Sequence, residues 1–194
     1  MADVAAAALP QERIPGEVGV WVFILGDMLI FALLFAVFVY YRGADIALFS
    51  KAQRSLNQSF GVLNTLLLLT SSWFVVHAVE ATREHRAPQA RALLGAAFGC
   101  GLGFMLVKYF EYGEKLAAGL TITTNDFFMY YYLLTGIHLL HVTLGMAVLA
   151  YLWARLRVAP DLDDAVSAIE SGASFWHMVD ILWIILFALV YLLR

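Results

Sequence analysis

Nine side chains that could bind a metal, hold a haem or transfer a proton lie within stretches of otherwise apolar sequence. A charged group in a membrane-spanning helix costs about 2.5–3.5 kcal/mol on insertion scales, so each such group is a candidate for function. Histidine and carboxylate side chains bind metals and carry protons in many proteins. The nine residues are Asp27, Asn64, His77, Lys108, Glu111, His138, His141, His177 and Asp180.

Six of these residues form pairs with a spacing of three, which places both members on one face of an α-helix. The pairs are Lys108 with Glu111, His138 with His141, and His177 with Asp180. Each pair could be satisfied internally, as an ion pair or a hydrogen-bonded pair, or could dock a neighbouring helix. The same residues could instead contribute to a metal or haem site in the membrane.

The expected depths of these residues argue against a single metal or haem site. At a rise of about 1.5 Å per residue, His177 and Asp180 would lie about 5–9 Å from one membrane surface and Glu111 nearly 30 Å from it. A di-iron carboxylate bundle requires two Glu-x-x-His motifs, and the sequence contains none. Cys100 is the only cysteine, which excludes an internal disulfide and a thiolate-bound cluster. We therefore expect no catalytic residue, metal or haem in this chain.

The elements that must position these residues are membrane-spanning helices. Of the 194 residues, 62% are hydrophobic and only 14% are charged, whereas soluble domains contain about 25% charged residues. The net charge of −3 provides no basic surface for nucleic acid. Apolar runs of about 20 residues predict an all-α integral membrane protein with five transmembrane helices in one domain, 1–194. The expected helices are 18–41, 60–79, 92–110, 127–153 and 174–193, with an acidic loop at about 155–173.

Three segments of these helices and one directly after the third helix carry a resemblance to a known family. They are LNTLLLLTSS at 63–72, Glu111 with Tyr112, LTGIHLLHVTLG at 134–145, and FWHMVDILW at 175–183. On these segments the chain resembles cytochrome c oxidase subunit III of the haem–copper oxidases. The likeness extends from about residue 18 to the last residue.

The resemblance implies a non-catalytic subunit of an oxidoreductase complex in the respiratory chain of a bacterial inner membrane. Such a subunit supports the assembly, stability, lipid binding and proton uptake of a catalytic subunit, which holds the haem and the copper or iron. Structural phospholipid and the catalytic subunit are therefore the expected partners. Lipid-facing or subunit-interface candidates are Asp27, Asn64, Glu111, His138, His141, Trp176, His177, Asp180 and Trp183.

Two departures from the family pattern leave an alternative open. Long family members have seven spans, and this chain lacks the first two, although relatives with five spans also occur. Lys108 stands where oxidase members often have Gln, and the run KYFEYGEK at 108–115 is closer to the branch associated with nitric oxide reductase. The alternative function is therefore an accessory or assembly protein of a bacterial nitric oxide reductase.

Asp27 lies where the family usually has a glutamate within the membrane. Its own span contains no basic residue, so we expect it to be neutral or to pair with a polar group from another helix. The family places the amino terminus in the cytoplasm and the carboxyl terminus in the periplasm. Basic residues are divided almost evenly between the two sides and do not decide this orientation.

Overall fold

The computed structural model describes residues 16–158 and 163–193 of the chain. The described residues form six α-helices and one π-helical turn, which continues the last helix. Five of the helices are long and apolar enough to cross a membrane, which confirms the expected all-α fold with five spans. The elements are α1 (Val18–Ala44), α2 (Ile46–Gln53), α3 (Gln58–Arg83), α4 (Ala87–Ala117), α5 (Asp126–Val158), α6 (Asp163–Phe187) and η1 (Ala188–Leu192).

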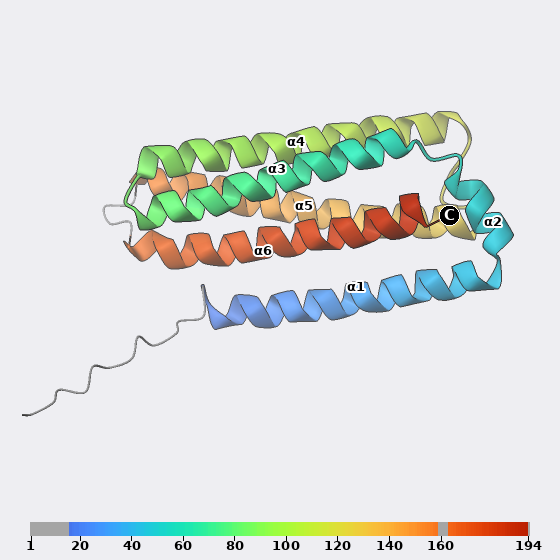
Figure 1. Ribbon diagram of the computed structural model, residues 1–194, viewed down its shortest axis with the longest axis horizontal. Helices are drawn as coiled ribbons and strands as arrows, with labels where there is room; N and C mark the ends of the chain where they lie inside the picture. The colour runs from blue at the N-terminus through green and yellow to red at the C-terminus, as the bar shows by residue number, and fades with distance from the viewer. Residues whose placement is uncertain (1–15, 159–162, 194) are drawn as a thin grey trace, which may run out of the picture.

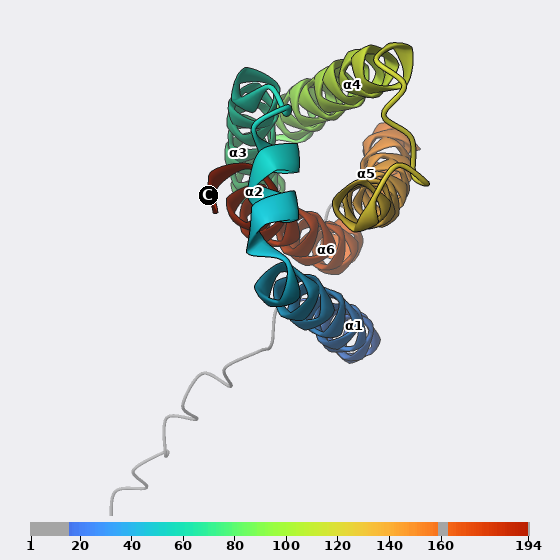
Figure 2. The same cartoon turned by 90° about the vertical axis from the view of Figure 1, so that its right-hand side faces the viewer.

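Long helices that follow one another in the chain run antiparallel along one common direction, whereas α1 runs parallel to α6 (Figure 1). The short helix α2, which the sequence analysis did not anticipate, crosses one end of the bundle. Seen end-on, α3, α4, α5 and α6 surround a common interior, whereas α1 lies outside this group and beside α6 (Figure 2). The start of α1 and the carboxyl end of η1 lie at opposite ends of the bundle.

Polar side chains set the boundaries of several helices. The Asp45 carboxylate accepts a hydrogen bond from the backbone N–H of Leu48 at the start of α2, and Asn57 caps α3 in the same way. Such caps satisfy backbone donors that have no partner within the helix. The connections between consecutive helices are short, and the long helices that they join run antiparallel.

The connection between α5 and α6 differs from the expected acidic loop. We expected a loop over about 155–173, but α5 continues to Val158 and α6 already begins at Asp163. Pro160 disfavours helix at that point, whereas 163–173 contains no proline and includes a surface-facing carboxylate. The Glu170 carboxylate lies 2.7 Å from the Arg83 guanidinium of α3, and this ion pair joins the first part of α6 to α3.

The core of the bundle lies among α3, α4, α5 and α6. Trp176 and Trp183 of α6 are fully buried there. A Cβ atom on Gly145 of α5 would lie 2.6 Å from the Trp176 ring, so only glycine allows this approach. By contrast, α1 has four buried residues among its 27: Ile24, Phe31, Phe35 and Phe38.

Candidate functional site: a closed polar core and an open lipid-facing cleft

An ion pair lies in the interior, near the carboxyl end of α4. Lys108 and Glu111 are spaced three residues apart and face the core, where their side chains are 1% and 0% exposed. The Lys108 Nζ lies 3.0 Å from the Glu111 Oε2. This confirms the predicted pairing, and it places both charges at a depth where an unpaired charge is costly.

Two tyrosines complete this pair into what we call the Lys108 cluster: Lys108, Glu111, Tyr131 and Tyr191. Lys108 donates to the hydroxyl oxygens of Tyr131 and Tyr191 at 3.4 and 3.2 Å. The two hydroxyls in turn donate to the Glu111 Oε1 at 2.8 and 2.5 Å. An ammonium has three N–H donors, and all three have acceptors here. The cluster is therefore closed, and it joins α4, α5 and η1.

The π-helical turn η1 positions Tyr191 in this cluster. A π-turn alters the hydrogen-bond pattern of a helix and leaves carbonyl groups to be satisfied by other donors. The Gln53 side chain donates to the carbonyls of Leu189 and Val190 at 3.0 and 3.1 Å. The Gln58 side chain donates to the carbonyl of Tyr191 at 2.8 Å. Residues of α2 and α3 therefore hold the end of the chain against the bundle.

His138 and His141 do not share a site, although their spacing predicted a shared face. His138 is fully buried and packs between the rings of Phe104 and Trp183, at centroid distances of 5.7 and 5.2 Å. Neither of its ring nitrogens has a hydrogen-bond partner among the described residues. His141 faces α1 instead. His138 therefore faces the interior of the four-helix group, and His141 faces α1.

Asp27 of α1 pairs with His141 of α5. The Asp27 Oδ2 lies 3.2 Å from the His141 Nε2, and the two side chains are 15% and 12% exposed. The His141 Nδ1 lies 2.9 Å from the carbonyl oxygen of Ile137. Because a carbonyl only accepts, Nδ1 carries a proton. The contact with Asp27 therefore holds one proton, either on the carboxyl or on the imidazole Nε2. Asp27 thus pairs with a polar group from another helix, which was one of the two states expected from the sequence.

His177 and Asp180 do not form the predicted pair. His177 instead docks α6 onto α3, with its Nδ1 2.6 Å from the Ser72 hydroxyl. Asp180 is 4% exposed, and neither carboxylate oxygen has a hydrogen-bond partner among the described residues. His177 faces α3, and Asp180 lies on the face of α6 that carries Trp176 and Trp183.

The other predicted site residues lie in the core. Trp183 donates from its Nε1 to the hydroxyl of Thr65 at 3.0 Å. The Asn64 amide and the Trp176 Nε1 are buried without a partner in the described part of the chain. Within the same part, no three His, Cys, Asp or Glu side chains are grouped as a metal would require. The expectation of a chain without a redox centre stays a prediction.

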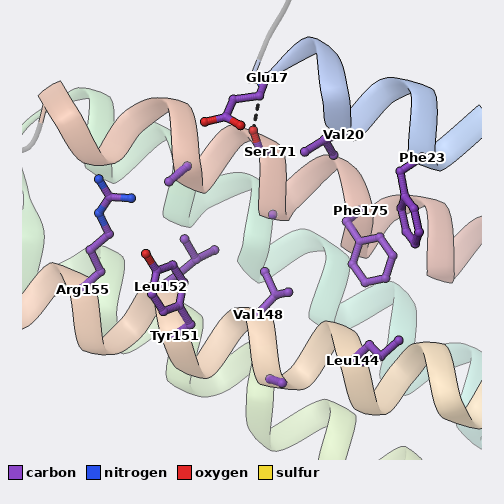
Figure 3. A pocket seen from close by; sticks show the side chains of 13 residues that line it. Glu17, Val20, Phe23, Leu144, Val148, Tyr151, Leu152, Arg155, Ser171 and Phe175 are labelled. Atoms are coloured by element: carbon purple, nitrogen blue, oxygen red, sulfur yellow. Dashed lines mark hydrogen bonds between the residues drawn. The ribbon is translucent and has the colours of Figure 1, made fainter.

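A cleft of about 670 Å³ opens between α1, α5 and α6 (Figure 3). Its walls are apolar: Val20 and Phe23 of α1 and Phe175 of α6 face Leu144 and Val148 of α5. Polar groups line its mouth, near the start of α1 and the end of α5. The Ser171 hydroxyl accepts from the backbone N–H of Glu17 at 2.9 Å, the Glu17 carboxylate lies beside this contact, and Arg155 and Tyr151 of α5 lie across the cleft from it.

Sequence reasoning missed the two tyrosines of the Lys108 cluster and the arginine of the cleft. Tyr131 and Tyr191 lie 20 and 80 residues from Glu111, so no local spacing connects them. Arg155 carried one usable signal, because a basic residue directly after an apolar run lies at headgroup level.

The fold and these two regions define a polytopic all-helical membrane protein whose polar side chains mainly join helices to one another. The family model for cytochrome c oxidase subunit III matches residues 13–194. The chain therefore belongs to the cytochrome c oxidase subunit III family.

Three relatives show the range of this similarity. Cytochrome c oxidase subunit 3 of Synechocystis sp. is 33% identical over 177 residues, which cover 90% of this chain and 74% of the relative. Cytochrome bo(3) ubiquinol oxidase subunit 3 of Buchnera aphidicola is 28% identical, covering 90% of this chain and 84% of the relative. Heme-copper oxidase subunit I+III of Aeropyrum pernix is 29% identical, covering 94% of this chain and 23% of the relative. The branch associated with nitric oxide reductase gains no support from these relatives and stays a prediction.

Proposed function

We propose that this chain is the non-catalytic subunit III of a haem–copper respiratory complex, and that it holds phospholipid beside the catalytic subunit. The observation that carries this proposal is the apolar cleft between α1 and the α5–α6 pair. The Aeropyrum relative supports the choice of partner, because its name places subunits I and III in one chain. The expected location is a bacterial inner membrane.

The chemistry of the cleft suits a phospholipid. Its walls consist of Val20, Phe23, Leu144, Val148 and Phe175, all of which favour acyl chains over water. Its mouth lies at the ends of α1 and α5, which is the level of the lipid headgroups. An arginine guanidinium at that level binds phosphate oxygens with a planar set of donors, and Arg155 occupies this place.

The Asp27–His141 pair adds a proton-holding group to the same region. Asp27 lies one helical turn beyond Phe23, and His141 lies about one turn beyond Leu144, so the pair follows the inner end of the cleft. The contact holds one proton and is partly exposed. We propose that it supports proton uptake by the catalytic subunit without taking part in electron transfer.

Purification of the complex through a tag on this chain tests the proposed partner. We expect the chain to bring down the catalytic subunit of an oxygen-reducing haem–copper oxidase, identified by mass spectrometry and by its haem spectrum. Recovery of a nitric oxide reductase instead would favour the accessory-protein alternative. Haem or metal in stoichiometric amount on the isolated chain would contradict a non-catalytic role.

Filling the cleft tests its proposed occupant. Ala147 lines the cleft and is exposed, so Ala147→Phe should occupy the space of an acyl chain. We expect the purified complex to lose bound phospholipid and to inactivate sooner during turnover. Ala154→Phe is the matched control, because Ala154 is exposed on the same helix but does not line the cleft. Equal lipid content in both variants would refute the assignment.

A further inference from the structure

A second apolar groove lies on the side of α5 that faces away from the cleft. It has a volume of about 290 Å³ and runs between α4 and α5. Residues 149, 150 and 153 of α5 line it, whereas 148, 151 and 155 line the cleft, so the two spaces occupy opposite faces of one helix. We call it the α4–α5 groove, and its lining residues are Leu94, Gly95, Phe98, Leu149, Ala150 and Trp153.

Two arginines flank one end of this groove. The guanidinium carbons of Arg91 and Arg157 lie 5.0 and 5.2 Å from the centroid of the Trp153 ring. Among the side chains that the structure describes, neither arginine has a carboxylate partner. The Arg91 Nε is buried and has no acceptor there. A buried guanidinium donor without an acceptor is costly, so this end of the groove is suited to an anion.

We propose that the α4–α5 groove binds an anionic phospholipid, with its phosphate on Arg91 and Arg157 and one acyl chain along the apolar lining. Both arginines lie near helix ends, Arg91 in the first turns of α4 and Arg157 in the last turn of α5. This is the level of the headgroups, where a tryptophan such as Trp153 is also favoured. A free phosphate would leave the apolar lining uncovered, whereas a lipid covers both parts.

The site depends on the membrane location of the chain and does not depend on its role as subunit III. A lipid with net negative charge gains from each basic side chain at its headgroup, and a zwitterionic lipid gains less. The α4–α5 groove should therefore prefer phosphatidylglycerol to phosphatidylethanolamine.

Photolabelling of the full-length chain in lipid vesicles tests the proposal. The probes are phosphatidylglycerol and phosphatidylethanolamine with the same diazirine-bearing acyl chain, and mass spectrometry maps the labelled residues. We expect phosphatidylglycerol to label the groove preferentially. In the Arg91→Gln/Arg157→Gln double variant, the ratio of labelling by phosphatidylglycerol to labelling by phosphatidylethanolamine should fall roughly thirtyfold, as expected for two basic groups at a headgroup. Arg86→Gln is the matched control, because Arg86 lies at the same end of α4 and already pairs with Glu84 and Gln89.

A second variant tests the acyl-chain part of the site. A Cβ on Gly95 would meet only the Trp153 Nε1, at 4.0 Å, so Gly95→Leu fills the groove without a backbone clash. We expect this variant to lose labelling in the groove and to keep labelling in the cleft at Val148 and Phe175, which shows that the chain is folded. Ala147→Phe should lose labelling in the cleft and keep it in the groove. The two variants therefore distinguish an error in the proposed cleft site from an error in the proposed groove site.

Three outcomes would overturn the proposal. The first is equal labelling of the groove by the two lipids, and the second is a double arginine variant that labels like the wild type. The third is a site for free phosphate: inorganic phosphate would then abolish the preference, and Gly95→Leu would still bind it.

Discussion

The four-helix group α3–α6 and the first helix use the membrane in different ways. In the four-helix group, charged and aromatic side chains are buried and the Lys108 cluster satisfies its own donors and acceptors. Most residues of α1 are exposed instead, and the Asp27–His141 pair and four buried side chains connect it to the bundle. Lipid tails provide no hydrophobic drive for helix association, so packing and interhelical hydrogen bonds decide which helices adhere. The difference indicates a rigid group and a more weakly attached helix that leaves space for lipid.

Removal of the Lys108 ammonium should have the largest effect on the rigid group. Lys108→Met leaves the Glu111 carboxyl buried without its cation, and breaking a buried pair in this way costs about 3–5 kcal/mol. The free energy of unfolding in mixed micelles would measure this loss, with Lys51→Met, an exposed lysine of α2, as the control. The Lys108→Met/Glu111→Gln double variant should recover most of the stability. If Lys108→Met unfolded like the control, the cluster would contribute nothing to stability.

A clash at the closest helix contact should have the next largest effect. Gly145→Ala places a Cβ 2.6 Å from the Trp176 ring, and such overpacking costs about 1–3 kcal/mol. Gly136→Ala, on the same helix with open space around its Cβ, should be neutral or slightly stabilising, because alanine favours helix. Thermal unfolding of the two variants measures the difference. Equal stabilities would mean that α5 and α6 separate easily at this contact.

The hydrogen bond between His177 and Ser72 should have a smaller effect. Ser72→Ala removes the partner of the His177 Nδ1 in the contact between α3 and α6. Interhelical hydrogen bonds in membranes contribute about 0.6 kcal/mol on average, and we expect a loss of that order in the same unfolding assay. Thr143→Val is a suitable control, since the Thr143 hydroxyl bonds only within its own helix. A loss of several kcal/mol would place this contact among the main supports of the bundle.

The smallest effect on stability is expected at Asp27, in the weakly attached helix. Asp27→Asn keeps a hydrogen-bonding group next to the His141 Nε2, so assembly should be nearly intact, with at most slower or shorter-lived turnover of the complex. Asp27→Leu leaves the imidazole without its partner and should cost more. Both variants would be compared for assembly and for activity during sustained turnover. Complete loss of assembly in Asp27→Asn would show that an ionised carboxylate is required.

Local spacing predicted what lies within one helix and failed where the partner came from another. The pairing of Lys108 with Glu111 followed from their spacing, and so did the five spans from the length of the apolar runs. The same spacing was misleading for His138 with His141 and for His177 with Asp180, because neighbouring helices offered His141 and His177 other partners. A spacing of three residues shows which side chains could meet on one helix. The packing of neighbouring helices decides whether they do.

The long-range parts of both regions had no local signal. The π-turn that brings Tyr191 to Glu111 depends on side chains of α2 and α3 that bond its carbonyls. The cleft depends on how α1 lies relative to α5 and α6, and the Asp27–His141 contact that joins α1 to α5 connects residues 114 positions apart. The resemblance to a family provided the functional interpretation, and the residues alone provided the membrane fold and the candidate positions.

The central claim is that this chain supports a catalytic subunit and performs no chemistry of its own. The most direct test compares the complex purified with and without this chain, measuring the initial turnover rate per catalytic subunit and the time to inactivation. The account predicts nearly equal initial rates and a clearly shorter working life without the chain. An initial rate that vanishes without the chain, while the catalytic subunit keeps its full haem and metal content, would contradict it.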